Sequence, residues 1–144
     1  MRFWDSSAIV PLLILEPTSD EIQRAYAEDG QVTLWWAAPV ECASAISRRE
    51  REGSLRPDEV ADAMRRLAIL AADWSEVEPA EPARRRALRM VQVHPLRAAD
   101  AFQLAAAELA AEGDPRSLPF VTLDERLADA ASREGFPVIL PRGA

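Results

Sequence analysis

Apolar and polar residues alternate along the chain in two periods, one typical of strands and the other of helices. Short runs rich in β-forming residues, each bounded by turn or capping residues, predict strands at 1–4, 31–35, 118–123 and 137–140, with a further short strand at Val77. Between them, apolar positions repeat with helical spacing. These repeats predict helices at 8–15, 18–28, from Pro39 onward, 56–74, 81–91, 96–113 and 126–133.

The order of these elements predicts the fold class. Strand and helix alternate, which is typical of a parallel α/β sheet with right-handed crossovers. No internal repeat, low-complexity tract or Gly/Ser linker divides the 144 residues, so we expect a single domain over 1–144. The apolar face of the helix expected over 56–74 is predicted to cover the core with Met64, Leu67 and Leu70.

Hydropathy predicts a soluble protein of the cytoplasm with no membrane partner. The apolar run 9–15 is closed by Glu16 and Pro17, well short of the roughly 18 to 20 residues that a membrane helix needs. The first five residues also lack the basic and then apolar order of a signal peptide. Hydrophobic residues make up 49% and charged residues 28% of the chain, an ordinary globular balance that argues against disorder.

The residue types that are scarce exclude several chemistries. The chain has one cysteine, Cys42, and one histidine, His94, which excludes a structural disulfide, a zinc finger and a two-histidine ribonuclease mechanism within one chain. All 17 basic residues are arginine, so Schiff-base and P-loop lysine mechanisms are also excluded. We expect Cys42 to be a small buried residue on the side of its helix opposite Glu41, and His94 to lie in a loop. Carboxylates are the plentiful reactive groups.

Four acidic residues each fall at the end of a predicted strand or in the first turn of a helix. Asp5 and Asp124 follow strands, whereas Glu41 and Asp100 lie in the first turns of helices. Because these positions share one edge of a parallel sheet, the four carboxylates are expected to face one cleft, where they would repel one another without a cation. Ligands that are all oxygen suit Mg²⁺ or Mn²⁺, and such a site is well suited to phosphoryl chemistry.

The same four positions have a simpler interpretation. Asp and Glu are common caps and first-turn residues, stabilised there by the helix dipole by about 0.3–1 kcal/mol. For any one of the acids this capping role explains the sequence as well as a metal does, and for Asp124 both roles are compatible. That all four are only caps is much harder to reconcile with their placement.

Four segments, in order along the chain, resemble the motifs of PIN-domain proteins and, more narrowly, of the VapC toxins of bacterial VapBC toxin-antitoxin pairs. The segments are WDSSA at 4–8, PVECASA at 39–45, LRAADAFQLA at 96–105 and FVTLDERL at 120–127. The resemblance implies a three-layer α/β/α sandwich around a central, mainly parallel sheet. It also implies an endoribonuclease that depends on Mg²⁺ or Mn²⁺, often a homodimer, and inhibited by a VapB-type antitoxin whose C-terminal tail covers the site.

The resemblance also implies roles for individual residues. Asp5 and Asp100 match the surest metal ligands, Glu41 completes the set, and Asp124 contributes directly or through water. Two positions with small hydroxyl side chains match residues that support the acids, namely Ser6 and Thr122.

Other positions depart from the family pattern or have open interpretations. Gln103 stands where the family often has histidine, and we do not expect the metal site to need it. The stretch 52–93 matches nothing specific, so the RNA and its cleavage sequence are not predicted. Arg97 is a weak candidate for RNA contact, with an ion pair to Asp100 three residues later as the favoured interpretation. One ring of Trp35-Trp36 is expected in the core and the other at an interface or on a base.

Three functions of different classes fit a small acidic α/β protein. The leading hypothesis is a toxin ribonuclease in which metal-activated water attacks an RNA phosphodiester. The alternative is a catalytically idle PIN-like module that acts through antitoxin or dimer contacts. A phospho-acceptor receiver domain is excluded because a chain without lysine lacks its late-strand lysine.

The net charge of −7 opposes the binding of RNA by overall attraction, so RNA binding must depend on local arginines and the metal ion. We expect the arginine clusters at 48–51 and 84–89 to be solvated faces.

Overall fold

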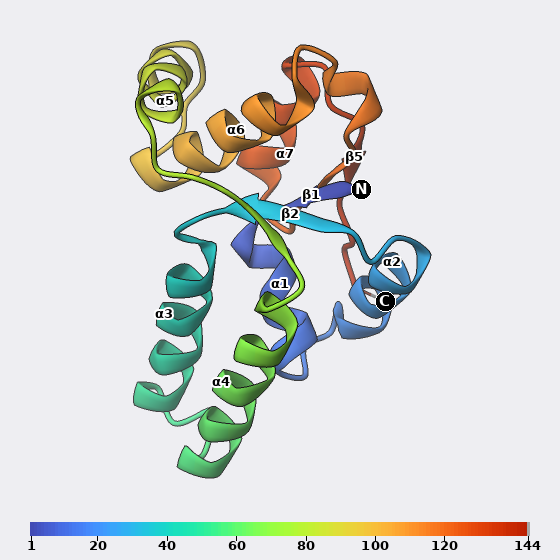
Figure 1. Cartoon of the computed structure of the whole chain (residues 1–144). Coiled ribbons are helices and arrows are strands. Elements are labelled where there is room, and N and C mark those ends of the chain that lie inside the picture. Colours follow the sequence, from blue (N-terminus) through green and yellow to red (C-terminus); the bar gives the residue numbers. More distant parts are fainter. Residues whose placement is uncertain (144) are drawn as a thin grey trace.

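The computed structural model describes residues 1–143 as a sheet with helices on both of its faces (Figure 1). The strands are β1 (Arg2–Trp4), β2 (Val32–Trp35), β3 (Ser75–Val77), β4 (Phe120–Val121) and β5 (Val138–Ile139). The helices are α1 (Ser6–Leu13), α2 (Ser19–Glu28), α3 (Ala38–Arg51), α4 (Pro57–Ala71), α5 (Glu81–Val93), α6 (Ala98–Ala111) and α7 (Glu125–Arg133), with a 3₁₀ turn η1 (Pro115–Ser117).

The sheet has the strand order β3-β2-β1-β4-β5, and every neighbouring pair is parallel. At the centre, Phe3 of β1 pairs with Thr33 on one side and with Phe120 on the other. The chain builds outward from β1 to β3, then crosses back to lay β4 on the opposite side of β1. The strand order therefore reverses between β1 and β4, and ligands of open α/β sheets collect at the carboxyl ends of strands at such a point.

Two separate apolar cores cover the two faces of the sheet. Phe3 stacks on Phe120 at 5.2 Å between ring centroids and packs with residues of α5, α6 and α7. The next residue, Trp4, points to the other face and packs with residues of α1 to α4. Figure 1 shows α5, α6 and α7 above the sheet and α1, α3 and α4 below it. The expected α/β class and the three layers are confirmed, and the sheet is wholly parallel.

Two details differ from the prediction. The strand expected over 118–123 is confined to Phe120–Val121, because the preceding residues form η1 and the chain turns toward α7 after Thr122. Met64 was predicted to face the core and is 37% exposed. Helix α4 rests on its neighbours through the narrower stripe of Ala63 and Leu67, so Met64 lies beside this stripe and in contact with solvent. None of the helices within residues 1–143 is long and apolar enough to cross a membrane.

His94 follows α5 directly and lies outside the helix, as expected, but it is buried against the end of α7. Its Nε2 lies 2.6 Å from Oε2 of Glu134, whose Oε1 accepts a hydrogen bond from Arg89 at 3.1 Å. Burial alone would raise the pKa of Glu134, but these hydrogen bonds more than offset it and the pKa is lowered from its usual 4.5. The Glu134 carboxylate therefore joins the last turn of α5 to the end of α7.

Removing the Glu134 charge is expected to destabilise the fold. Glu134→Gln should lower the free energy of unfolding by about 1–3 kcal/mol at neutral pH, because it weakens two charge-assisted hydrogen bonds to a buried group. Since the folded-state pKa of Glu134 is lowered, its contribution is full above pH 4.5 and declines as pH falls below that value. Urea unfolding from pH 7 to pH 3.5 measures this change.

Asp129→Gln is the control, because its ion pair with Arg133 is exposed on the same helix. A Glu134→Gln protein as stable as this control at pH 7 would contradict the prediction.

Candidate metal centre

Asp5 follows β1 directly and turns its side chain toward the end of β4. It occupies the N-cap position of α1 but makes no side-chain capping bond, so the capping interpretation fails for this residue. Its backbone N–H donates to the carbonyl of Val121 at 3.0 Å, and the residue is 3% exposed. Asp5 is therefore a buried carboxylate at the point where the strand order reverses.

Two hydroxyl groups hold the Asp5 carboxylate. Thr122 Oγ1 donates to Asp5 Oδ2 at 2.7 Å, and the Ser7 hydroxyl donates to the same oxygen. Both hydroxyls also accept backbone N–H bonds, Ser7 from Leu123 at 2.9 Å and Thr122 from Asp124 at 3.0 Å. We call Ser7 and Thr122 the hydroxyl clamp. It ties the end of β1 to the loop after β4.

The structure has hydrogen bonds to Asp5 from both predicted hydroxyl residues, Thr122 and Ser6, and a third from Ser7, which was not predicted. Ser6 Oγ is 3.4 Å from Asp5 Oδ1, a long contact, whereas Ser7 makes the shorter bond and the link to the β4 loop. The signal for Ser7 was its spacing: it lies two residues after Asp5, on the first turn of α1. The resemblance alone pointed to its neighbour.

Glu41 and Gln103 meet across the end of the sheet. Glu41 lies in the first turn of α3, after Pro39 at the second helical position, and Gln103 lies on α6 one turn after Asp100. Gln103 Nε2 donates to Glu41 Oε1 at 2.5 Å, and Gln103 is 1% exposed. No contact is predicted for Gln103 from the sequence, because the two residues are 62 positions apart.

Asp100 and Asp124 line one hollow of about 490 Å³. Asp124 does cap α7, because its Oδ1 accepts from the backbone of Arg126 at 2.9 Å and of Leu127 at 3.2 Å. Its Oδ2 has no hydrogen-bond donor within residues 1–143, so the cap leaves one carboxylate oxygen available. Both roles expected for Asp124 are therefore compatible with its geometry.

Two arginines line the same hollow, Arg97 and Arg126. The ion pair expected between Arg97 and Asp100 does not form at 4.0 Å or less in the described chain. Arg97 is the N-cap residue of α6 and has an extended backbone, so it lies outside the helix within which side chains three residues apart are neighbours. Burial raises the pKa of Asp100, and the charges of both guanidinium groups offset part of this rise. Arg126 was not among the residues predicted to have a functional role.

The four acids, Asp5, Glu41, Asp100 and Asp124, form one electrostatic cluster. Burial raises the pKa of Asp5, against the lowering effect of the hydroxyl clamp, and the charge of Asp124 raises it further. Burial raises the pKa of Glu41 to about 7, with Asp5 and Asp100 adding to the shift. Burial raises the pKa of Asp100 as well, and Asp124 and Asp5 add to this shift. Three of the acids therefore resist ionisation, first because they are buried and further because the other acids are close.

The donor set fits a hard divalent cation. Every candidate ligand is a carboxylate oxygen, and Asp5 and Asp124 are each anchored through one oxygen, Oδ2 in Asp5 and Oδ1 in Asp124. Among residues 1–143, no three acidic, histidine or cysteine side chains already lie close enough to enclose an ion. Mutual repulsion opposes such an approach until a positive charge is present.

Cys42 provides no alternative chemistry at this site. Its thiol is buried as expected, but it lies near the acids rather than away from them, with Sγ 3.7 Å from the carbonyl oxygen of Ser6. Burial raises the pKa of Cys42 to about 12, and the charges of Asp5 and Glu41 add to this effect. The thiolate needed for nucleophilic attack is therefore strongly disfavoured.

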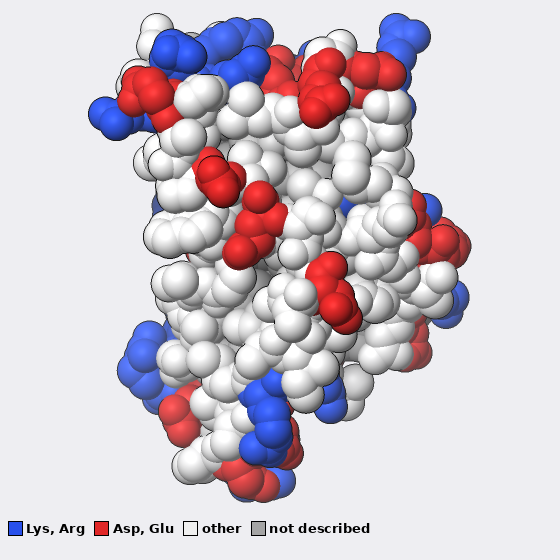
Figure 2. Space-filling model, in the orientation of Figure 1, with Lys and Arg blue, Asp and Glu red and all other residues white. Residues whose placement is uncertain are grey.

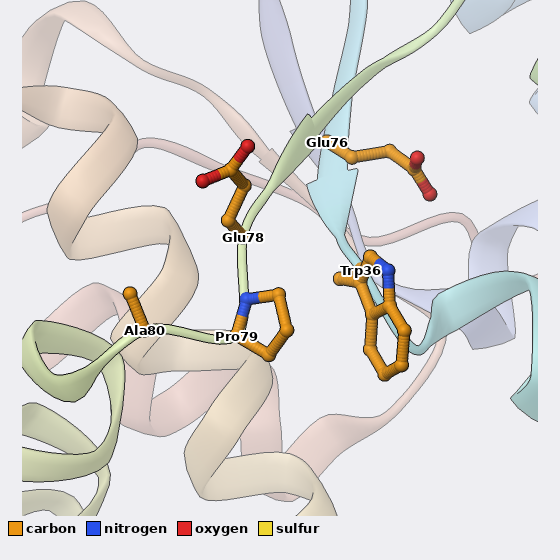
Figure 3. Close-up of a pocket in the computed structure, with 5 residues that line it drawn as sticks. All are labelled: Trp36, Glu76, Glu78, Pro79 and Ala80. Atoms are coloured by element: carbon orange, nitrogen blue, oxygen red, sulfur yellow. The ribbon is translucent and has the colours of Figure 1, made fainter.

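Another hollow, of about 540 Å³, lies at the β3 edge of the sheet (Figure 3). Trp36 stands on one side of β3, and the carboxylates of Glu76 and Glu78 point away on either side of the strand. Trp36 is 54% exposed, whereas Trp35 is buried and stacks on Phe102 at 5.2 Å between centroids. The expected core position of one ring is thus confirmed for Trp35, whereas an interface or base contact for the other ring stays a prediction. None of the four acids lines this hollow.

Comparison with known families agrees with the fold and with the order of the motifs. The PIN domain family model matches residues 2–133, which include all four acids. The chain belongs to the PIN domain family. PIN domains are generally nucleases. No curated protein matches the sequence significantly.

Several solved structures share this PIN domain fold. A toxin-antitoxin complex from Klebsiella pneumoniae matches with a TM-score of 0.67 and 16% identity, covering 100% of both chains. FitAcB from Neisseria gonorrhoeae matches with a TM-score of 0.66 and 18% identity over 98% of each chain. PAE2754 from Pyrobaculum aerophilum has a TM-score of 0.62 and 19% identity, covering 90% of this chain and 83% of its own. At these identities the likeness concerns the fold.

The raised pKa of Glu41 predicts a pH-dependent stability of the metal-free PIN domain. A carboxyl group whose pKa is higher in the folded state binds protons more tightly there, so stability falls as pH rises from about 4.5 to about 7. Glu41→Gln removes this contribution. With a chelator present, the variant should have the higher melting temperature at pH 8, and the difference should shrink toward pH 4.5.

Glu50→Gln is the matched control, because Glu50 is an exposed acid on the same helix. Its melting temperature should follow that of the unmodified chain at every pH. A Glu41→Gln curve that does the same would show that Glu41 ionises normally.

Proposed function

We propose that this PIN domain is a metal-dependent endoribonuclease, the VapC-type toxin of a type II toxin-antitoxin pair, acting as a single domain over residues 1–144. One observation carries the proposal. Acids from four separate segments come together where the strand order reverses between β1 and β4, close enough for their charges to raise one another's pKa values. The site offers carboxylates, hydroxyls and arginines but no reactive thiol. A hydrolytic reaction with water as the nucleophile fits this set.

Asp5, Asp100, Glu41 and Asp124 would hold Mg²⁺ or Mn²⁺. When bound, such an ion supplies an activated water, polarises the phosphoryl oxygen and stabilises the leaving oxygen. The chain contributes the placement of the ligands. The hydroxyl clamp fixes Asp5, and the start of α7 fixes Asp124 through two backbone N–H groups. Ligands fixed in advance need less reordering when the substrate arrives.

Arg97 and Arg126 are the proposed contacts for the phosphodiester. They line the hollow that contains Asp100 and Asp124, and neither makes an ion pair within residues 1–143. Guanidinium groups bind phosphate oxygens with charge-assisted hydrogen bonds. Elsewhere, arginines gather over α5 and near the free ends of α3 and α4, with no continuous basic stripe across the face in Figure 2. RNA binding must therefore be local to the acids.

A VapB-type antitoxin and a second copy of the chain are the proposed protein partners. The similar Klebsiella pneumoniae structure is a toxin-antitoxin complex, and the present chain covers all of its matched chain. The cytoplasm, where transcripts and antitoxin are made, is the proposed location. A catalytically idle module would use the same partners without binding a metal, so metal binding separates the two hypotheses.

Substitution of the acids tests the nuclease. Asp5→Asn and Asp100→Asn should each abolish Mg²⁺-dependent RNA cleavage and cellular toxicity, because each removes a proposed ligand charge while conserving the shape of the side chain. Cleavage of labelled RNA with added Mg²⁺ or Mn²⁺ gives the rate, and circular dichroism checks the fold.

Asp20→Asn is the control, because Asp20 is an exposed acid on α2. Undiminished cleavage by both site variants would refute the nuclease assignment. Cleavage by none of the proteins, together with no Mn²⁺ binding in calorimetry, would favour the idle module.

The arginines should affect substrate binding more than the chemical step. Arg97→Ala and Arg126→Ala are each expected to raise the KM for RNA by about 10-fold, the equivalent of losing about 1.4 kcal/mol of phosphate binding, with a smaller change in kcat. Steady-state cleavage of a short RNA measures both constants.

Arg85→Ala serves as the control from the exposed arginine cluster on α5. If this variant raises KM as much as the two site variants do, the RNA contacts are spread over the surface and the local assignment is wrong.

A further inference from the structure

Gln103 is a polar exception on the buried side of α6. The residues that follow it, Leu104 and the alanines 105–107, are all fully buried and apolar. Gln103 is equally buried at 1% exposure, yet it carries an amide. A buried amide must find hydrogen-bond partners to offset its loss of water.

The amide of Gln103 is only half satisfied. Nε2 donates to Glu41 Oε1 at 2.5 Å, but Oε1 of Gln103 is buried with no hydrogen-bond partner among the described residues. An apolar side chain of similar length would fill the same space without leaving an acceptor unpaired. The residue is therefore poorly explained by packing, and its one bond is to a proposed metal ligand.

That bond crosses from one layer of the molecule to the other. Glu41 belongs to α3, which packs on the Trp4 face of the sheet, whereas Gln103 belongs to α6 on the Phe3 face. Gln103 also lies three residues after Asp100, so the two side chains share one side of α6. Fixing Glu41 to Gln103 consequently fixes the position of Glu41 relative to Asp100.

The neutral amide suits this task. An arginine at this position would form an ion pair with Glu41 and compete with a cation for its charge. An amide N–H orients the carboxylate and leaves its negative charge for the ion. Partners that orient metal ligands in this way commonly affect metal affinity by about 10- to 100-fold.

We propose that Gln103 is a positioning residue that holds the Glu41 carboxylate at its place opposite Asp100, ready to bind a divalent cation. The proposal rests on the proposed function, since it assigns Gln103 to the same metal site. It differs from the sequence-based expectation that the site does not need this residue.

Gln103→Met removes the donor at nearly constant volume and is the principal test. Mn²⁺ binding is measured by calorimetry, and thermal unfolding is measured with a chelator present. We expect Mn²⁺ affinity to fall by about 10-fold or more, while the metal-free melting temperature is unchanged or higher because an unpaired buried acceptor is gone. Gln23→Met, the same change at an exposed position of α2, should alter neither quantity.

Two further variants separate positioning from packing. Gln103→His restores a neutral donor and should recover part of the affinity that Gln103→Met loses. Gln103→Asn keeps the amide but is too short to reach Glu41, so it should bind Mn²⁺ as poorly as the Met variant. It also provides the affinity measurement if the Met variant does not fold.

Each outcome has a defined meaning. Wild-type affinity in the Met and Asn variants overturns the positioning role while leaving the metal site intact. A parallel loss of affinity and melting temperature in all three variants, with no recovery by histidine, assigns Gln103 to packing and also overturns the proposal. An unmodified chain that binds no Mn²⁺ overturns the proposed function first and this inference with it.

Discussion

The Asp5 carboxylate lies buried where β1 and β4 end, and a buried anion requires hydrogen-bond donors that remain in place. The hydroxyl clamp of Ser7 and Thr122 supplies them, and the same hydroxyls accept N–H bonds from the loop that leads to α7. The position of Asp124 therefore depends on how Asp5 is held. The same few hydrogen bonds therefore serve the fold and the site, because the loop after β4 carries Asp124 and also holds Asp5.

The repulsion among the four acids is a cost that the rest of the molecule must offset. Two apolar cores, one on each face of the sheet, provide the stabilisation that allows such a cluster to persist. Pairs such as His94 with Glu134 contribute on the side of the molecule formed by α5 and α7. The site is thus a local concentration of unfavourable charge within an otherwise well-satisfied structure, a pattern typical of functional sites.

The sequence was informative where local patterns determine the outcome. Strand and helix signals placed Asp5 and Glu41 where a strand gives way to a helix, and they placed Asp100 in the first turn of its helix. The role of Gln103 and the link from Ser7 to Leu123 could not be predicted, because both depend on bonds between residues that are distant in the chain. Met64 was misplaced because helical spacing alone does not tell how wide a stripe the neighbouring helices cover.

The exposed edge strand of the sheet also affects whether the protein self-associates at high concentration. β3 is an outer strand, and its neighbour β2 satisfies one side of its backbone only. A free strand border can recruit other chains into intermolecular sheets. The carboxylates of Glu76 and Glu78 flank this border, so two molecules approaching through it would bring like charges together. The negative charge thereby opposes self-association through the β3 edge.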